Sequence, residues 1–391
     1  MKRLLLIISS VFIAVISVFI FKSGAFAAGQ AESISAKSVA PDSMALAGRL
    51  GKAIQFQTIS HEDDAGFNKD SFINFQKFLE QSFPKVHAAL KKEIVGEYSL
   101  LYTWQGGDEK ELPVLLSAHY DVVPAEPESG SWTYPPFDGQ IADGFIWGRG
   151  TLDDKMSVLG TMEAVEKLLQ EGYVPRRTIY LTFGHDEEIG GQQGAAKIAA
   201  LLKSRGVRLD YVLDEGLTIT EGIVPNISKP VALIGLAEKG CLSIELSVES
   251  EGGHSMMPPR QTAIGILSAA VNRLENDQFP ARMEVPVRRM FESLAPEMPF
   301  GMKIVFSNLW LFEGIVKNKL AAAPRTNALI RTTMAPTIFQ AGVKENVLAT
   351  KARAVVNYRI LPGDSIGKVL QRVQKTVNDP RVKITALERL K

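Results

Sequence analysis

Residues 177–206 have the sequence RTIYLTFGHDEEIGGQQGAAKIAALLKSRG. The β-branched and aromatic run at its start predicts a strand over 177–185, and the run rich in alanine and leucine predicts a helix over 191–206. Three adjacent acids stand between them: Asp186, Glu187 and Glu188. Because neighbouring carboxylates repel one another, this strand end needs a compensating positive charge.

The alternation of strand and helix runs through the first half of the chain. Short apolar runs predict three more strands, over 98–105, 112–119 and 209–216. Apolar residues at helical spacing predict three more helices, over 43–53, 70–82 and 156–172. This order is typical of an α/β sheet with helices on its faces, and such sheets place their sites at the carboxyl ends of the strands.

The pattern changes near Glu238. Residues 241–250 alternate apolar and polar side chains, which predicts a strand that is exposed on one face. A helix is predicted over 261–275, and further strands and a helix over 346–361, 365–377 and 382–387. We therefore expect three parts after residue 27: a linker over 28–42, a larger domain over 43–238 and a smaller α/β domain over 239–388.

The composition excludes several kinds of site. The chain of 391 residues contains one cysteine, Cys241, so it forms no internal disulfide and no zinc finger of cysteines. Its formal net charge of +1 gives no reason to expect nucleic acid or an acidic membrane as a partner. Any metal would be held by His, Asp and Glu side chains.

The first 27 residues are predicted to lie outside the fold. Lys2 and Arg3 precede an uncharged apolar run over 4–21, and residues 25–27 form an A-x-A cleavage signal. The run is long for the core of a secretory signal and just long enough to span a bilayer. The segment is thus either a cleaved signal or a membrane anchor, and both predict that the rest of the chain lies outside the cytoplasm.

Four predicted element ends carry pairs of polar residues. The pairs are His119 and Asp121, Asp153 and Asp154, Glu187 and Glu188, and Asp214 and Glu215. Each pair alone has an ordinary explanation, such as a buried histidine bonded to the backbone, a solvated acidic turn or a helix cap. If the ends converge, however, one pocket holds an imidazole and several carboxylates, which cannot all stay ionised without cations. Divalent metals bound by nitrogen and oxygen, zinc above all, solve this problem.

The chemistry of a metal pair suggests a role for each group. His119 would bind one metal, and Asp121 would accept the other ring N–H. One carboxylate, for which we choose Asp153, would bridge two ions roughly 3.5–4 Å apart. Glu187 and Glu188 point in opposite directions on an extended chain, so one would bind metal while the other acts as general base on a water.

Five motifs occur in an order and at separations that resemble one enzyme family. They are SAHYDVVP (117–124), GRGTLDDK (148–155), HDEEIGG (185–191), LDEG (213–216) and GGHSMMPP (252–259). The set resembles the co-catalytic zinc exopeptidases, the family of aminoacylase, glutamate carboxypeptidase and carboxypeptidase S. QFQTISHED (55–63) and NVLATKARAVVNYRILPGDS (346–365) are most similar to the carboxypeptidase S branch.

The resemblance implies an α/β fold. A zinc-exopeptidase-like catalytic sheet, with helices on both faces, would occupy 43–238, and an inserted lid or dimerisation domain would occupy 239–388. It implies two zinc ions. His119 and Asp214 would bind one ion, Glu188 would bind the other, and Asp153 would bridge them. Asp154 would be a neighbour of the site and not a ligand.

The resemblance also implies roles for residues that do not bind metal. Glu187 would be the general base, and Asp121 would be the partner of His119. His254 matches a lid histidine that stabilises the oxyanion, often in the pocket of the partner subunit. Asn346 and Arg359 match lid positions that contact substrate.

The chain departs from the family pattern in one respect. The family places a last histidine ligand of the second metal after the lid. The histidines of this chain are His61, His87, His119, His185 and His254. We therefore expect a truncated member whose second zinc site is incomplete.

The expected activity is hydrolysis of an amide bond next to a free carboxylate, in short peptides cleaved at their C-terminus or in N-acyl amino acids. Met256, Met257 and a predicted loop over 286–325 are candidates for substrate selection, and the lid domain would allow a homodimer. The alternative is a catalytically dead remnant that only binds a ligand or a partner. Two tightly bound zinc ions per chain would favour the enzyme, and one or none the remnant.

Overall fold

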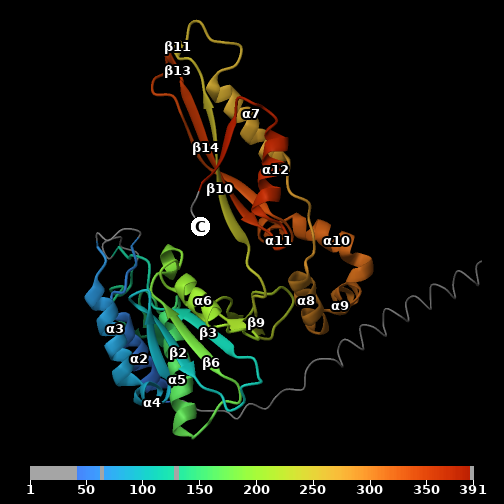
Figure 1. Cartoon of the computed structure of the whole chain (residues 1–391). Helices are drawn as coiled ribbons and strands as arrows, with labels where there is room; N and C mark the ends of the chain where they lie inside the picture. Colours follow the sequence, from blue (N-terminus) through green and yellow to red (C-terminus); the bar gives the residue numbers. More distant parts are fainter. Residues whose placement is uncertain (1–41, 62–65, 127–131, 388–391) are drawn as a thin grey trace, which may run out of the picture. The chain divides into compact units, whose positions relative to one another are not determined.

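The computed structural model describes residues 42–61, 66–126 and 132–387 (Figure 1). The chain divides between Gly216 and Leu217 into two compact units. The first unit comprises the described residues up to Gly216, and the second unit comprises those from Leu217 onward.

A five-stranded sheet in the order β1-β2-β6-β3-β7 forms the centre of the first unit. The strands are β1 (Lys91–Val95), β2 (Ser99–Trp104), β3 (Val114–His119), β6 (Ile179–Gly184) and β7 (Val212–Leu213), the last much shorter than the strand predicted over 209–216. β3 runs parallel to β6 and β7, whereas β2 is antiparallel to β6. The carboxyl ends of β3, β6 and β7 therefore meet at one edge of the sheet, beside the start of β2.

Helices cover both faces of this sheet, as the sequence predicts (Figure 1). They are α2 (Ser43–Ile54), α3 (Lys69–Ser82), α4 (Pro84–Ala89), α5 (Lys155–Gln170) and α6 (Ala195–Ser204). On one face, Phe75 of α3 and Val158 of α5 share a core with Leu181 of β6. On the other face, Ile198 of α6 shares a core with Leu101 of β2.

Local sequence decides where these helices begin and end. The Asp42 side chain accepts a hydrogen bond from the backbone N–H of Ala45 at 3.1 Å and so caps the start of α2. Pro84 occupies the first turn of α4, and α3 ends just before it at Ser82. A hairpin of β4 (Gln140–Ala142) and β5 (Phe145–Trp147) precedes α5.

The second unit contains a four-stranded antiparallel sheet in the order β12-β14-β10-β15. Its strands are β10 (Gly240–Glu249), β12 (Thr333–Ala341), β14 (Lys351–Ile360) and β15 (Lys383–Leu387), and its helices α7 (Ala263–Asn276) and α12 (Ile366–Val377) share a core with the sheet. The alternation over 241–250 is confirmed, because Leu242, Ile244 and Leu246 are buried on the helix-covered face. β11 (Gly253–His254) and β13 (Val347–Leu348) pair separately.

The loop predicted over 286–325 is wrong. This segment is helical, with α8 (Val285–Leu294), the short helix η3 (Ala295–Glu297), α9 (Phe300–Ser307), α10 (Leu309–Ala321) and α11 (Pro324–Ile330). Prolines at 286, 296, 299 and 324 cut the segment into short helices, and each stands at a helix start, where its missing N–H costs least. These interruptions hide the helical spacing from a reading of the sequence.

The two compact units divide at residue 216, before the boundary predicted at residue 238. Residues between the two positions form the hairpin of β8 (Ile219–Thr220) and β9 (Val231–Ala232). Ile227 shares a hydrophobic core with Phe291 and Leu309, so the segment folds with the helices of the second unit.

The predicted signal or anchor over 1–27 lies outside the described residues, as do nearly all of the predicted linker and the residues after Leu387. In the ranges that the structure does describe, no helix has the length and apolar character needed to cross a membrane.

Candidate metal centre

The predicted polar residues of the first unit gather at the carboxyl edge of its sheet. His119 is the last residue of β3, and Asp121 follows two positions later. Asp154 stands directly before α5. Glu187 and Glu188 form the short helix η2 (Glu187–Ile189), which follows β6. Glu215 follows β7, so four segments distant in sequence supply one site.

His119 lies at the centre of this cluster and is buried. Its Nδ1 is 3.0 Å from the backbone carbonyl oxygen of Asp121 and 3.3 Å from the carboxylate of the same residue. Its Nε2 is 2.9 Å from Oδ1 of Asp153, 3.3 Å from Oε2 of Glu215 and 3.9 Å from Oε2 of Glu187. One ring nitrogen thus faces Asp121, and the other faces the acids.

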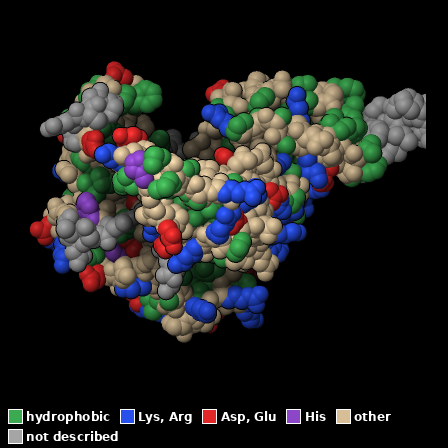
Figure 2. Space-filling model, turned by 90° about the horizontal axis from the view of Figure 1, so that it is seen from above, with side chains coloured by type: hydrophobic (Ala, Val, Ile, Leu, Met, Phe, Trp, Pro, Cys, Tyr) green, Lys and Arg blue, Asp and Glu red, His purple; other side chains and the backbone are tan. Residues whose placement is uncertain are grey.

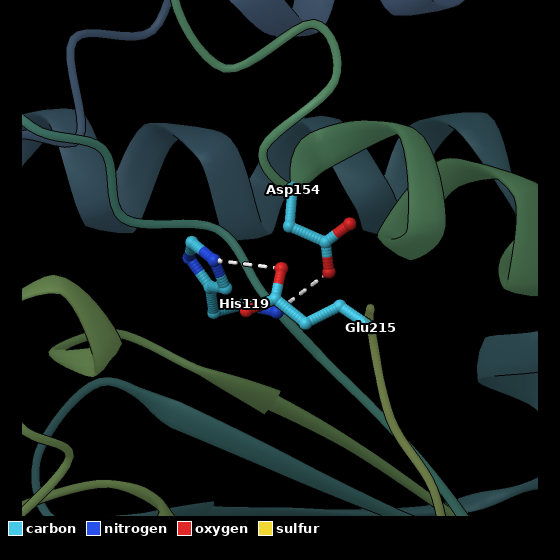
Figure 3. Close-up of side chains that lie close together, drawn as sticks. All are labelled: His119, Asp154 and Glu215. Carbon is cyan, nitrogen blue, oxygen red and sulfur yellow. Dashed lines mark hydrogen bonds and ion pairs between the residues drawn. The ribbon is translucent and has the colours of Figure 1, made fainter. Parts of the chain in front are cut away.

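Two overlapping groups of side chains have the spacing of metal ligands. One consists of His119, Asp154 and Glu215 (Figure 3), and the other of His119, Asp153 and Glu188. In each group the ligand atoms lie within 4.8 Å of one another. His119 belongs to both groups, and the second group contains three of the predicted zinc ligands.

Asp214, which the sequence predicts as a ligand, stands outside both groups. Its Oδ1 accepts a hydrogen bond from the backbone N–H of Glu215 at 3.0 Å, and Glu215 offers its carboxylate to the cluster instead. Asp154, expected to be only a neighbour, is buried, and its Oδ2 is 3.4 Å from the backbone nitrogen of His119. In the sequence, each of these residues is one of two adjacent acids, which leaves open whether one or both face the site. Asp153 and Asp154 both lie in ligand groups, whereas only Glu215 of the second pair does.

Asp121 connects the histidine to the acidic loop. Its carboxylate is fully buried and accepts hydrogen bonds from the backbone N–H groups of Glu187 and Glu188, both at 3.1 Å. It also accepts from Oγ of Ser60 at 2.8 Å, a residue that the sequence prediction missed. Burial alone would raise the pKa of Asp121, but the hydrogen bond and charge of His119 outweigh burial and lower the pKa.

The acids of the cluster are held in an unfavourable electrostatic state. Burial, together with repulsion from neighbouring acids, raises the pKa of Glu187 and Glu188, and it raises the pKa of Glu215 to about 7. Burial opposes a charge on His119, but Asp121, Glu215 and Glu187 outweigh it and raise the pKa of the ring to about 10. Carboxylates crowded around one imidazole fit a divalent cation with nitrogen and oxygen ligands, because the cation would relieve their repulsion.

This electrostatic state predicts that metal binding releases protons. With a pKa of about 10, the ring of His119 is protonated at neutral pH, and a metal must displace that proton to take its nitrogen. We expect zinc binding at neutral pH to release about one proton from His119, with more from Glu215, and zinc affinity to fall as the pH falls. Calorimetric titration in two buffers of different ionisation enthalpy counts the protons. A His119→Asn variant should release fewer, and an equal release would contradict the assignment.

The predicted lid residues belong to the second unit. His254 is exposed in β11, and its Nδ1 accepts a hydrogen bond from the backbone N–H of Met256 at 3.1 Å. Asn346 lies beside it, since its backbone carbonyl accepts from the N–H of Ser255 at 3.1 Å. Arg359 is exposed on β14. The second unit therefore brings His254 and Asn346 together, while the metal-ligand groups belong to the first unit.

Two family models and several known proteins match this chain. A family model described as peptidase family M20/M25/M40 matches residues 115–309, and one described as a peptidase dimerisation domain matches residues 236–385. The probable carboxypeptidase S-like 2 of Dictyostelium discoideum is 45% identical over 349 residues, which cover 88% of this chain and 67% of that protein. The chain belongs to peptidase family M20/M25/M40. This membership confirms the resemblance to the family of aminoacylase and carboxypeptidase S that the sequence motifs indicate.

Two further similar proteins carry the names of two different enzymes. The N-fatty-acyl-amino acid synthase/hydrolase PM20D1.1 of Danio rerio is 48% identical over 335 residues, which cover 85% of this chain and 65% of the relative. Carboxypeptidase S of Saccharomyces cerevisiae is 35% identical over 339 residues, which cover 83% of this chain and 58% of the relative. This chain thus spans about two thirds or less of the length of these relatives.

Solved structures confirm the predicted α/β fold. The M20 family metallo-carboxypeptidase Sso-CP2 of Sulfolobus solfataricus superimposes with a TM-score of 0.59 at 18% identity, over 87% of this chain and 77% of that chain. Human carnosine dipeptidase 1 gives a TM-score of 0.54 at 14% identity, over 88% and 76%. At these identities the likeness concerns the fold alone.

Proposed function

We propose that this M20 chain is a metal-dependent hydrolase of amide bonds that lie next to a free carboxylate. The observation that carries the proposal is the pair of ligand groups that share His119, with Glu187 beside them. The names of the relatives support a substrate class of short peptides cleaved at their C-terminus or of N-acyl amino acids.

The donor set suits two zinc ions. The imidazole of His119 and the carboxylates of Asp153 and Glu188 would hold metal, with Asp153 as the bridge. The remaining ligand would come from the acids after β7, where Glu215 lies in a ligand group and Asp214 was predicted. When bound, zinc acts as a Lewis acid that polarises a carbonyl and lowers the pKa of water towards neutrality.

Glu187 is the residue that we propose to move the proton. It belongs to neither ligand group, its side chain is about half exposed, and Oε2 lies 3.9 Å from Nε2 of His119. Burial raises the pKa of Glu187, which brings the carboxylate closer to the range suited to proton transfer near neutral pH. It would take a proton from the attacking water and give it to the nitrogen of the leaving amine.

Asp121 and three residues of the second unit have further roles in the proposed reaction. Asp121 holds His119 through the ring and holds the loop of Glu187 and Glu188 through their N–H groups. We propose that His254 stabilises the oxyanion, in its own chain or in that of a partner in a homodimer, and that Asn346 and Arg359 contact substrate. Arg359 would supply the positive charge that recognises a free carboxylate.

Removing and restoring metal tests the proposed function directly. We expect a chelator to abolish hydrolysis of an N-acyl amino acid and zinc to restore it, with two ions bound per chain. The same substrate with its carboxylate converted to an amide should react far more slowly, because Arg359 then loses its ionic partner. A zinc-loaded chain that binds the substrate but shows no turnover would refute the proposal in favour of a binding protein.

A further inference from the structure

The loop that carries Glu187 and Glu188 is held from two sides. Asp121 binds their backbone N–H groups, as described above. Two other buried polar side chains hold the loop on the side away from Asp121. They are Asp186, at the start of the loop, and Ser99 on β2, and neither has a role in the proposed chemistry.

Asp186 closes the loop on itself. Its Oδ2 accepts a hydrogen bond from the backbone N–H of Gln193 at 2.7 Å, and its carbonyl oxygen accepts from the N–H of Gly191 at 2.7 Å. Only 4% of Asp186 is exposed, so water competes little for these bonds. One residue therefore ties the start of the loop to its end, across Glu187 and Glu188.

Ser99 anchors the same loop to the sheet. It is the first residue of β2 and is fully buried, and its Oγ accepts from the backbone N–H of His185 at 3.2 Å. The same Oγ lies 2.6 Å from Nδ1 of the His185 ring. Because β2 pairs with β6, a hydroxyl on the neighbouring strand fixes the residue that immediately precedes Asp186.

The space beside Gly194 is filled by the side chains of Asp186 and Ser99. A Cβ atom at this glycine would lie 2.4 Å from Oδ1 of Asp186 and 2.5 Å from Oγ of Ser99. Real contacts of this kind do not come so close, so the two side chains and the glycine backbone fill the space behind the loop.

We propose that Asp186 and Ser99 are positioning residues, which act through the loop to set the places of Glu187 and Glu188. Neither touches a metal-ligand group or the reacting atoms. The inference deepens the proposed function, on which it rests. A purely structural role would affect stability alone. A positioning role affects metal affinity and the proton-transfer step at a given stability.

The test compares Asp186→Ala and Ser99→Ala with Gln76→Ala as a matched control. Gln76 is buried in the same unit and donates to the backbone carbonyl of Tyr98 at 2.8 Å and to the Tyr120 hydroxyl at 3.0 Å. Among the described residues, neither of these hydrogen bonds reaches the loop of Glu187 and Glu188. Zinc affinity, kcat, KM and the melting temperature are measured for each. We expect the first two variants to lose about 10–100-fold in zinc affinity and to lose kcat with little change in KM. Gln76→Ala should lower only the melting temperature.

A conservative variant separates an effect on the position of the loop from an effect on the stability of the protein. Asp186→Asn keeps an acceptor for the N–H of Gln193, so it should recover most of the zinc affinity that Asp186→Ala loses. If Asp186→Ala does not fold, Ser99→Ala, which removes a single oxygen, decides the question. Alanine variants that match Gln76→Ala in zinc affinity and kcat would overturn the inference. Zinc affinity is measured without substrate, so a wild-type chain that binds zinc but lacks turnover refutes the proposed function and leaves this test intact.

Discussion

Replacing Glu187 with glutamine should lower kcat by about 10²–10⁴-fold, the usual contribution of a general acid or base. The amide has nearly the shape of the carboxylate but cannot accept the proton of the attacking water. Because Glu187 stands outside both ligand groups, zinc content should stay at the wild-type value. Steady-state kinetics and elemental analysis of the same preparation measure the two effects.

Glu163→Gln is the matched control for this change. Glu163 belongs to the same unit and accepts a hydrogen bond from Nη2 of Arg49 at 3.0 Å, but it belongs to neither ligand group. Its substitution removes one carboxylate without touching the proposed chemistry. Wild-type turnover in Glu187→Gln, or equal losses in the two variants, would rule out Glu187 as the base.

Removing His119 should have the largest effect on metal binding. His119 is the only member common to both ligand groups, so His119→Ala weakens both. Loss of an outer-shell partner alone typically costs 10–100-fold in metal affinity, and we expect loss of this ligand to cost at least about 100-fold. Activity should fall with metal content, and a competition titration with a coloured chelator measures the affinity.

His87→Ala controls for the loss of an imidazole. The ring of His87 belongs to the same unit, where Nδ1 is 2.9 Å from the carbonyl oxygen of Phe83 and Nε2 is 3.0 Å from the Tyr102 hydroxyl. It lies outside both ligand groups, so its loss should lower stability and leave zinc affinity unchanged. A His119→Ala chain that still bound two zinc ions would show that the ligands lie elsewhere.

The sequence could predict the first unit because its signals are local. The strand before His119 and the strand before Asp186 are apolar runs that end in polar residues, and the parallel pairing of β3 and β6 places both ends at one edge. His119 and Glu188 lie together for this reason, and the segment before α5 brings Asp153 to the same place. The side-chain alternation over 241–250 was equally informative, since period two places every second residue on the buried face.

The remaining features depend on information that is not local. At the doubled acid after β7, one carboxylate faces the site and the other bonds to the local backbone, so Glu215 and not Asp214 lies in a ligand group. The helices over Val285–Ile330 are too short and too often interrupted by proline to show a clear period. Ser60 and Ser99 form hydrogen bonds with residues that are distant in the sequence. Nothing in the local sequence around a serine predicts such a bond.

The division at Gly216 has a consequence for how this protein can change over time. Both ligand groups and the proposed base lie before the division, whereas the candidates for substrate choice, Met256, Met257 and the helices from α8 to α11, all lie after it. Apart from His254, substitutions in the second unit would therefore alter the proposed choice of substrate without changing the ligand groups of the first unit. Under the proposed function, the choice of substrate would then evolve in one unit while the metal ligands and the proposed base are preserved in the other.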